Sequence, residues 1–80
     1  MSIAAEKVQF CINAVATGTV QRFAEREKIM TTVALREFMK TATYDLLLEN
    51  EAYLYLESPE YVLDMWDAER RGDWKRWIDI

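Results

Sequence analysis

Apolar residues recur at steps of three and four along most of this chain, a spacing that places them on one face of an α-helix. The first stripe predicts a long helix over residues 2–27, beginning near the N-cap residue Ser2, with Glu6 close to the positive end of the helix dipole. Gly18 interrupts this stripe, and because a glycine inside a helix costs about 1 kcal/mol against alanine, we expect a kink near it. The stripe consists of Ala5, Val8, Ile12, Val15, Thr19 and Phe23.

Two further stripes follow the turn "KIMTT", in which Thr31 or Thr32 is able to cap the next helix. The apolar face rotates near Thr43, so the pattern indicates either one bent helix or two helices, over residues 32–42 and 43–56. We favour two. The second stripe is Leu35, Phe38, Met39, Ala42 and Leu46, and the third is Tyr44, Leu47, Leu48, Glu51 and Tyr55.

The clearest helix start is "SPEY", where Ser58 suits the N-cap and Pro59 suits the first helical position. This helix should run over residues 59–71 and end at Gly72, with a short turn over residues 73–79 after it. Its core-facing side is expected to carry Val62, Met65, Trp66 and Glu69. We therefore predict an all-α fold, a small bundle of about four helices in a single domain over residues 1–80.

The amino-acid composition excludes several kinds of catalytic and metal site. The 80 residues include one cysteine and no histidine, which removes Ser-His-Asp and Cys-His catalysis and most zinc sites. Cys11 lies in an apolar helical stretch, where a thiol is usually inert packing. Carboxylates spaced i,i+3 exist, but without a Glu-x-x-His motif a solvated helix face is favoured over a metal or acid–base site. We expect no enzyme, no catalytic residue, no cofactor and no metal.

The location is also constrained. Glu6 and Lys7 stand where a signal peptide would need an unbroken apolar stretch, and no run approaches the length of a membrane span. One cysteine cannot form an intrachain disulfide, which favours a reducing compartment. A soluble, cytoplasmic protein without membrane contact is expected.

Charge is distributed unevenly along the chain. Between Thr41 and Glu69 there are eight acidic residues and no lysine or arginine, although the net charge is only −4. Four tyrosines lie in or near this block and either face the core or, if exposed, complete a surface for a basic protein partner. The alternative without a binding role is a solvated face that keeps the protein soluble. The candidate partner-binding residues are Glu49, Glu51, Tyr53, Glu57, Glu60 and Asp64.

The C-terminal segment combines tryptophans with cations. Such a segment could stack nucleic-acid bases, but four cations in an otherwise acidic protein make a weak electrostatic footprint. A latch that buries tryptophan in a thin core is the favoured interpretation, and a regulatory nucleic-acid binder is the alternative. The residues concerned are Trp66, Arg70, Arg71, Trp74, Lys75, Arg76 and Trp77.

Three stretches, "VQFCIN", "LREFMKTATYDLLLENEAYLYLES" and "EYVLDMWDAE", resemble a family of short bacterial helical proteins of unknown function. Members share an early Phe-Cys-Ile helix, a Phe…Tyr-Leu-Leu helix and a final helix that begins with tyrosine. Where the family usually has Leu-His, this chain reads Leu56-Glu57. The matching positions are Phe10, Cys11 and Ile12, then Phe38, Tyr44, Leu46 and Leu47, then Tyr61, Val62, Leu63, Asp64 and Met65.

The resemblance implies a neutralising or accessory role, because members are often encoded beside proteins of ADP-ribosyltransferase fold. Our leading hypothesis is a non-enzymatic, antitoxin-like or accessory protein-interaction module whose acidic, tyrosine-rich face binds a basic, toxin-like enzyme. A homodimer, or a structural homo-oligomer without further activity, is a further alternative because a small domain can bury surplus aromatic surface against a second copy.

Overall fold

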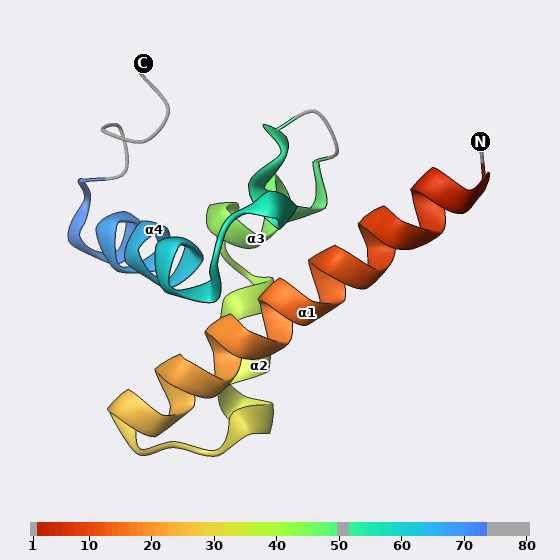
Figure 1. The fold of residues 1–80 in the computed structure, drawn as a ribbon. Coiled ribbons are helices and arrows are strands. Elements are labelled where there is room, and N and C mark those ends of the chain that lie inside the picture. Colours follow the sequence, from red (N-terminus) through yellow and green to blue (C-terminus); the bar gives the residue numbers. More distant parts are fainter. Residues whose placement is uncertain (1, 50–51, 74–80) are drawn as a thin grey trace.

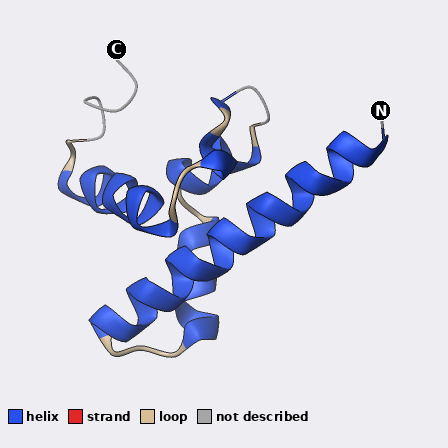
Figure 2. Cartoon of the chain, in the orientation of Figure 1, coloured by secondary structure: helices blue, strands red, loops and turns tan. Residues whose placement is uncertain are grey.

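Four α-helices and one short 3-10 helix make up residues 2–49 and 52–73, the part of the chain that the structure describes. In this computed structural model the elements follow one another as α1 (Ser2–Glu27), α2 (Thr31–Met39), α3 (Ala42–Leu48), the 3-10 helix η2 (Leu54–Leu56) and α4 (Pro59–Arg71). No strand occurs in these residues (Figure 2). The all-α prediction is confirmed, and the predicted turn over residues 73–79 lies almost wholly outside the described residues.

Helix α1 is the element against which the others pack. It contacts α2, α3, η2 and α4, while its N-terminal end extends past them (Figure 1). Along α1 the predicted stripe is buried at Ile12, Val15, Thr19 and Phe23. The period-3.6 prediction is therefore confirmed for these residues of the longest helix.

An aromatic stack forms the centre of the core. The rings of Phe23 and Trp66 are stacked with centroids 3.9 Å apart, and Phe38 lies 4.9 Å from Trp66 and 5.4 Å from Tyr44. Trp66 is only 2% exposed. The four rings come from α1, α2, α3 and α4, so the stack joins these helices into one unit. Burying each such side chain contributes roughly 2–3 kcal/mol.

The long helix predicted over residues 2–27 is confirmed, since α1 is uninterrupted at Gly18, and Figure 1 draws it without a visible bend there. The glycine serves a close approach instead, because a Cβ there would lie 2.7 Å from Cγ and 3.0 Å from Cβ of Pro59. Its neighbour Thr19 donates a hydrogen bond from Oγ1 to the Val15 carbonyl at 2.8 Å and approaches the Pro59 carbonyl at 3.4 Å. Gly18 thus lets the first turn of α4 lie directly on α1.

The predicted helix over residues 43–56 is also wrong in extent. A separate α3 does begin near Thr43, but it ends at Leu48. Thr41 caps it, its Oγ1 accepting a hydrogen bond from the Tyr44 amide at 3.0 Å. Tyr53 has φ of 56°, a left-handed conformation that no helix interior allows, so only one 3-10 turn follows before Glu57.

A side chain of α4 stabilises the junction between α2 and α3. Glu69 of α4 accepts hydrogen bonds from the backbone amides of Ala42 and Thr43, each at 2.9 Å, and from the Thr43 hydroxyl at 2.7 Å. The first amides of a helix have no partner within it, so this carboxylate satisfies two of them and complements the helix dipole.

Caps decide the remaining helix ends. The predicted cap of α2 by Thr31 or Thr32 is wrong, because Met30 occupies the N-cap position and makes no side-chain hydrogen bond. At α4 the prediction is confirmed: the Ser58 hydroxyl accepts from the Tyr61 amide at 3.2 Å, with Pro59 in the first turn. The helix ends at Gly72, whose φ of 83° suits glycine.

Candidate functional site

The predicted partner-binding residues lie on or beside three consecutive elements. Glu49 follows α3 as its C-cap, Tyr53 precedes η2, Glu57 follows η2, and Asp64 lies in the second turn of α4. Glu51 lies outside the described residues. Since α3 contacts η2, and η2 leads into α4 after two residues, the backbone presents this set along one continuous path.

Exposed apolar side chains accompany these acids. Leu56 is 70% exposed, Tyr53 58% and Tyr61 37%. Tyr44 and Tyr55 are partly buried, so the tyrosines divide evenly between core and surface. We refer to Glu49, Tyr53, Leu56, Glu57, Tyr61 and Asp64 together as the acidic-aromatic surface.

Other carboxylates of the acidic block already have partners. Arg26 makes a two-pronged ion pair with Asp67, both N–O distances being 2.7 Å, and this lowers the pKa of Asp67 below its ordinary value. Glu60 lies 2.7 Å from Arg22, and its own backbone amide together with Arg22 lowers its pKa. Glu60 belonged to the predicted set, but its charge is shared with a cation of α1.

Four carboxylates of the block lack such a partner within the described residues. Asp45, Glu49, Glu57 and Asp64 are exposed and take part in no hydrogen bond or ion pair through their side chains. Negative charge that no described cation pairs with is therefore concentrated over the stretch from α3 to α4, where the exposed leucine and tyrosines also lie.

The C-terminal candidate residues are only partly described. Trp66 is a core residue, which supports the latch interpretation for this tryptophan. Arg70 lies 5.1 Å from the Phe23 ring centroid and 3.8 Å from Asp67, and Arg71 pairs with Asp73 at 3.3 Å. Trp74, Lys75, Arg76 and Trp77 lie outside the described residues. Both described arginines thus contact carboxylates of their own chain.

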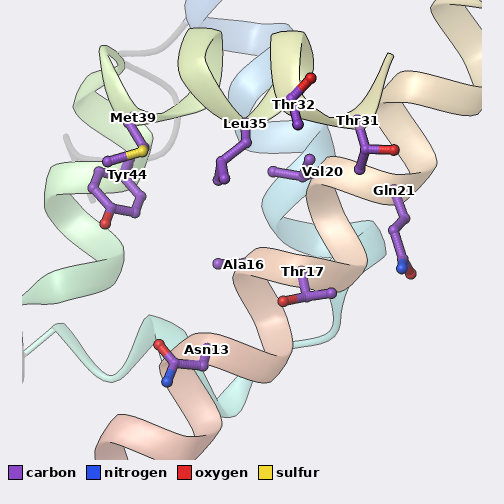
Figure 3. A pocket seen from close by; sticks show the side chains of 10 residues that line it. All are labelled: Asn13, Ala16, Thr17, Val20, Gln21, Thr31, Thr32, Leu35, Met39 and Tyr44. Carbon is purple, nitrogen blue, oxygen red and sulfur yellow. The ribbon is translucent and has the colours of Figure 1, made fainter. Parts of the chain in front are cut away.

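An apolar groove between α1 and α2 was not predicted. Its volume is about 400 Å³, and Leu35 points into the space between the two helices (Figure 3). Leu35 is 42% exposed and Met39 52%, so these two residues of the second stripe are not buried. Helix α2 has nine residues and packs through Ala34 and Phe38, which leaves the flanking side chains at the groove. The lining is Asn13, Ala16, Thr17, Val20, Gln21, Thr31, Thr32, Leu35, Met39 and Tyr44, and we call it the neutral groove.

Within the described residues, no group of three or more Cys, Asp or Glu side chains is placed to hold a metal ion. Cys11 is half-buried on α1. None of the helices described is long and apolar enough to span a bilayer. Comparison of the chain with known protein families, curated proteins and solved structures finds no match to any of them.

Proposed function

We propose that this protein works by binding another protein through the acidic-aromatic surface and catalyses no reaction. The observation that supports this is the coincidence, over one stretch of chain, of large exposed apolar side chains and of carboxylates that meet no cation among the described residues. A surface that served only solubility would carry the charges without the exposed leucine and tyrosines.

The contrast with the rest of the molecule strengthens this proposal. Arginines of α1 reach across to α4 and neutralise Glu60 and Asp67, so cations are available close by. Glu57 and Asp64 nevertheless receive none within the described residues. Tyrosine combined with charge is typical of protein-recognition surfaces, since its ring offers contact area at low cost in conformational entropy.

The chemistry of the surface defines the partner. Carboxylates select lysine or arginine, and Leu56 and Tyr53 require apolar or aromatic groups beside those cations. We therefore propose a basic protein partner with apolar side chains interspersed in its contact segment. The resemblance to bacterial helical proteins would make that partner a toxin-like enzyme of ADP-ribosyltransferase fold, with this chain in an antitoxin-like role.

Binding to a defined probe tests the proposal. Isothermal titration with a synthetic peptide that alternates lysine and leucine should give measurable affinity, and replacing its leucines by serine should weaken it. The double variant Glu57→Gln/Asp64→Asn should weaken binding and reduce its salt dependence, because fewer charges meet the peptide. Leu56→Ser should weaken binding without changing the salt dependence.

A matched control separates local from general electrostatics. Glu6 and Glu25 of α1 are exposed carboxylates outside the surface, without a partner among the described residues, so Glu6→Gln/Glu25→Gln removes the same charge elsewhere. Equal loss of affinity in this control and in the Glu57/Asp64 variant would reduce the interaction to nonspecific charge attraction, and the proposal would be abandoned.

A further inference from the structure

The outer face of α1 differs from the rest of this acidic chain in having no charge. From Val8 to Gln21 the sequence contains no Asp, Glu, Lys or Arg, although these make up 30% of the chain. Solvent-facing helix positions usually carry charged residues, because charge keeps them hydrated. Here the exposed positions are Gln9, Phe10, Asn13, Ala14, Thr17 and Gln21.

Phe10 is the most exposed large apolar residue described, at 73%. It precedes Thr17 by seven residues, which is two helical turns, or about 10 Å along α1 on the same face. Thr17 lines the neutral groove, so α1 carries both an exposed aromatic ring and the edge of an apolar groove on one side. Figure 3 shows Thr17 and Val20 on α1 opposite Leu35 on α2.

We propose that two copies of this chain associate through this face, with their α1 helices antiparallel and Phe10 of each copy in the neutral groove of the other. We place a twofold axis between Asn13 and Ala14, perpendicular to α1. Residues equally far from this axis then face each other, so residue 10 of one helix lies opposite residue 17 of the other. The same patch thus supplies both halves of the contact, as an isologous interface requires.

Charge selects a second copy as the occupant. Two copies of an acidic protein repel each other wherever their carboxylates meet, which disfavours pairing through the acidic-aromatic surface. The lining of the neutral groove contains no charged residue, whereas the hollow beside Trp66 is lined by Glu27, Glu37, Lys40, Glu69 and Arg70. A face without charge lets identical chains meet without placing like charges against each other.

Helix geometry permits the close contact. Ala14 is exposed and small, and it lies between Phe10 and Thr17 along α1, so the two helix backbones can approach there. The contact involves one helix face and one groove, which places it at the low end of interface sizes. We therefore expect a dimer that dissociates on dilution rather than an obligate one.

Sedimentation equilibrium of the full chain over a wide concentration range provides the test. The wild-type protein should show a monomer–dimer equilibrium, and Phe10→Glu should raise the dimer dissociation constant at least about 100-fold, because each dimer loses the contact twice and gains two buried charges. The matched control is Leu56→Glu, since Leu56 is as exposed as Phe10 but belongs to the other surface. It should leave self-association unchanged.

Crosslinking supplies an independent readout of the geometry. In a Cys11→Ala background, Ala14→Cys should form a disulfide-linked dimer under mild oxidation, whereas Lys40→Cys, an exposed site that does not line the groove, should not. Circular dichroism should confirm that both variants fold.

Three results would overturn the proposal. The wild-type chain could be monomeric at every concentration, or the dimer could persist in Phe10→Glu. Native mass spectrometry could also show a monomer with a small apolar molecule bound instead of a second copy. Binding of the lysine–leucine peptide should survive Phe10→Glu, so failure of this proposal is distinguishable from failure of the proposed function.

Discussion

Removing the Glu69 carboxylate should destabilise the fold, because this side chain of α4 holds the first amides of α3. Its two oxygens accept three hydrogen bonds, from the amides of Ala42 and Thr43 and from the Thr43 hydroxyl, at 2.7–2.9 Å. A hydrogen bond to a charged group contributes about 1.5–3 kcal/mol. The three bonds share one carboxylate that is only partly buried, so their contributions do not add. We expect Glu69→Ala to lower the free energy of unfolding by about 2–3 kcal/mol.

Glu69→Gln should be nearly as harmful, although it conserves shape. One carboxylate oxygen faces the Ala42 amide and the other faces the Thr43 amide and hydroxyl, so all three partners donate. A glutamine must present its NH₂ group to one of those donors, leaving an amide unsatisfied. We expect a loss of about 2 kcal/mol, which is a large share of the roughly 4–12 kcal/mol that an 80-residue domain possesses.

Urea unfolding followed by far-UV circular dichroism measures the effect. With a slope of about 1 kcal/mol per molar urea for a small domain, the midpoint should fall by about 2 M. Glu25→Gln, an exposed carboxylate on α1, is the control and should change the unfolding free energy by less than about 0.5 kcal/mol. In a double-mutant cycle with Thr43→Val, the combined loss should be smaller than the sum of the single losses. A Glu69→Gln variant as stable as the control would refute this account of the α2–α3 junction.

Two other changes probe the contact between α1 and α4. Gly18→Ala should lower the unfolding free energy by about 1 kcal/mol, because the new methyl meets the Pro59 ring at 2.7 Å. Helix propensity alone would raise the unfolding free energy by a similar amount. Thermal denaturation measures the sign of the change, and a more stable variant would contradict the close contact. Acidification should weaken the fold through Asp67, because Arg26 holds the pKa of this carboxyl below the ordinary 3.8. The stabilisation by the ion pair is fully present above pH 3.8, and it is lost as the pH falls through the lower folded-state pKa. Unfolding measured across this range should show a shallower decline in Asp67→Asn, and an identical slope in both proteins would exclude the ion pair as a source of acid sensitivity.

Local signals predicted the ends of α4 correctly, whereas the start of α3 also depends on a distant residue. Ser58, Pro59 and Gly72 act through neighbouring backbone groups, so their types at that spacing suffice to locate the helix. At the start of α3, Thr41 caps the Tyr44 amide locally, but the amides of Ala42 and Thr43 are satisfied by Glu69, which is 26 residues from Thr43. No periodicity analysis contains that information.

The candidate surfaces show the same limit. The acidic block is visible in the sequence, but which acids are neutralised is decided by α1: Arg22 lies against Glu60, and Arg26 against Asp67. Leu35 and Met39 fit a core stripe by spacing, yet both are exposed because the short α2 packs through other residues. Their exposure follows from how closely two helices approach, which depends on tertiary packing.

The two proposed surfaces should respond to salt in opposite directions. Pairing of a basic partner with Glu57 and Asp64 is electrostatic at an exposed surface, so added sodium chloride screens it and weakens binding. Contact between two copies through Phe10 and the neutral groove buries apolar area without charge, and sulfate should strengthen it by disfavouring exposed apolar surface. Sedimentation and peptide titration at matched ionic strengths therefore separate the surfaces without any mutation. A self-association that weakens steeply with salt would place charged residues in the dimer contact, which an α1 face without charge between Val8 and Gln21 does not provide.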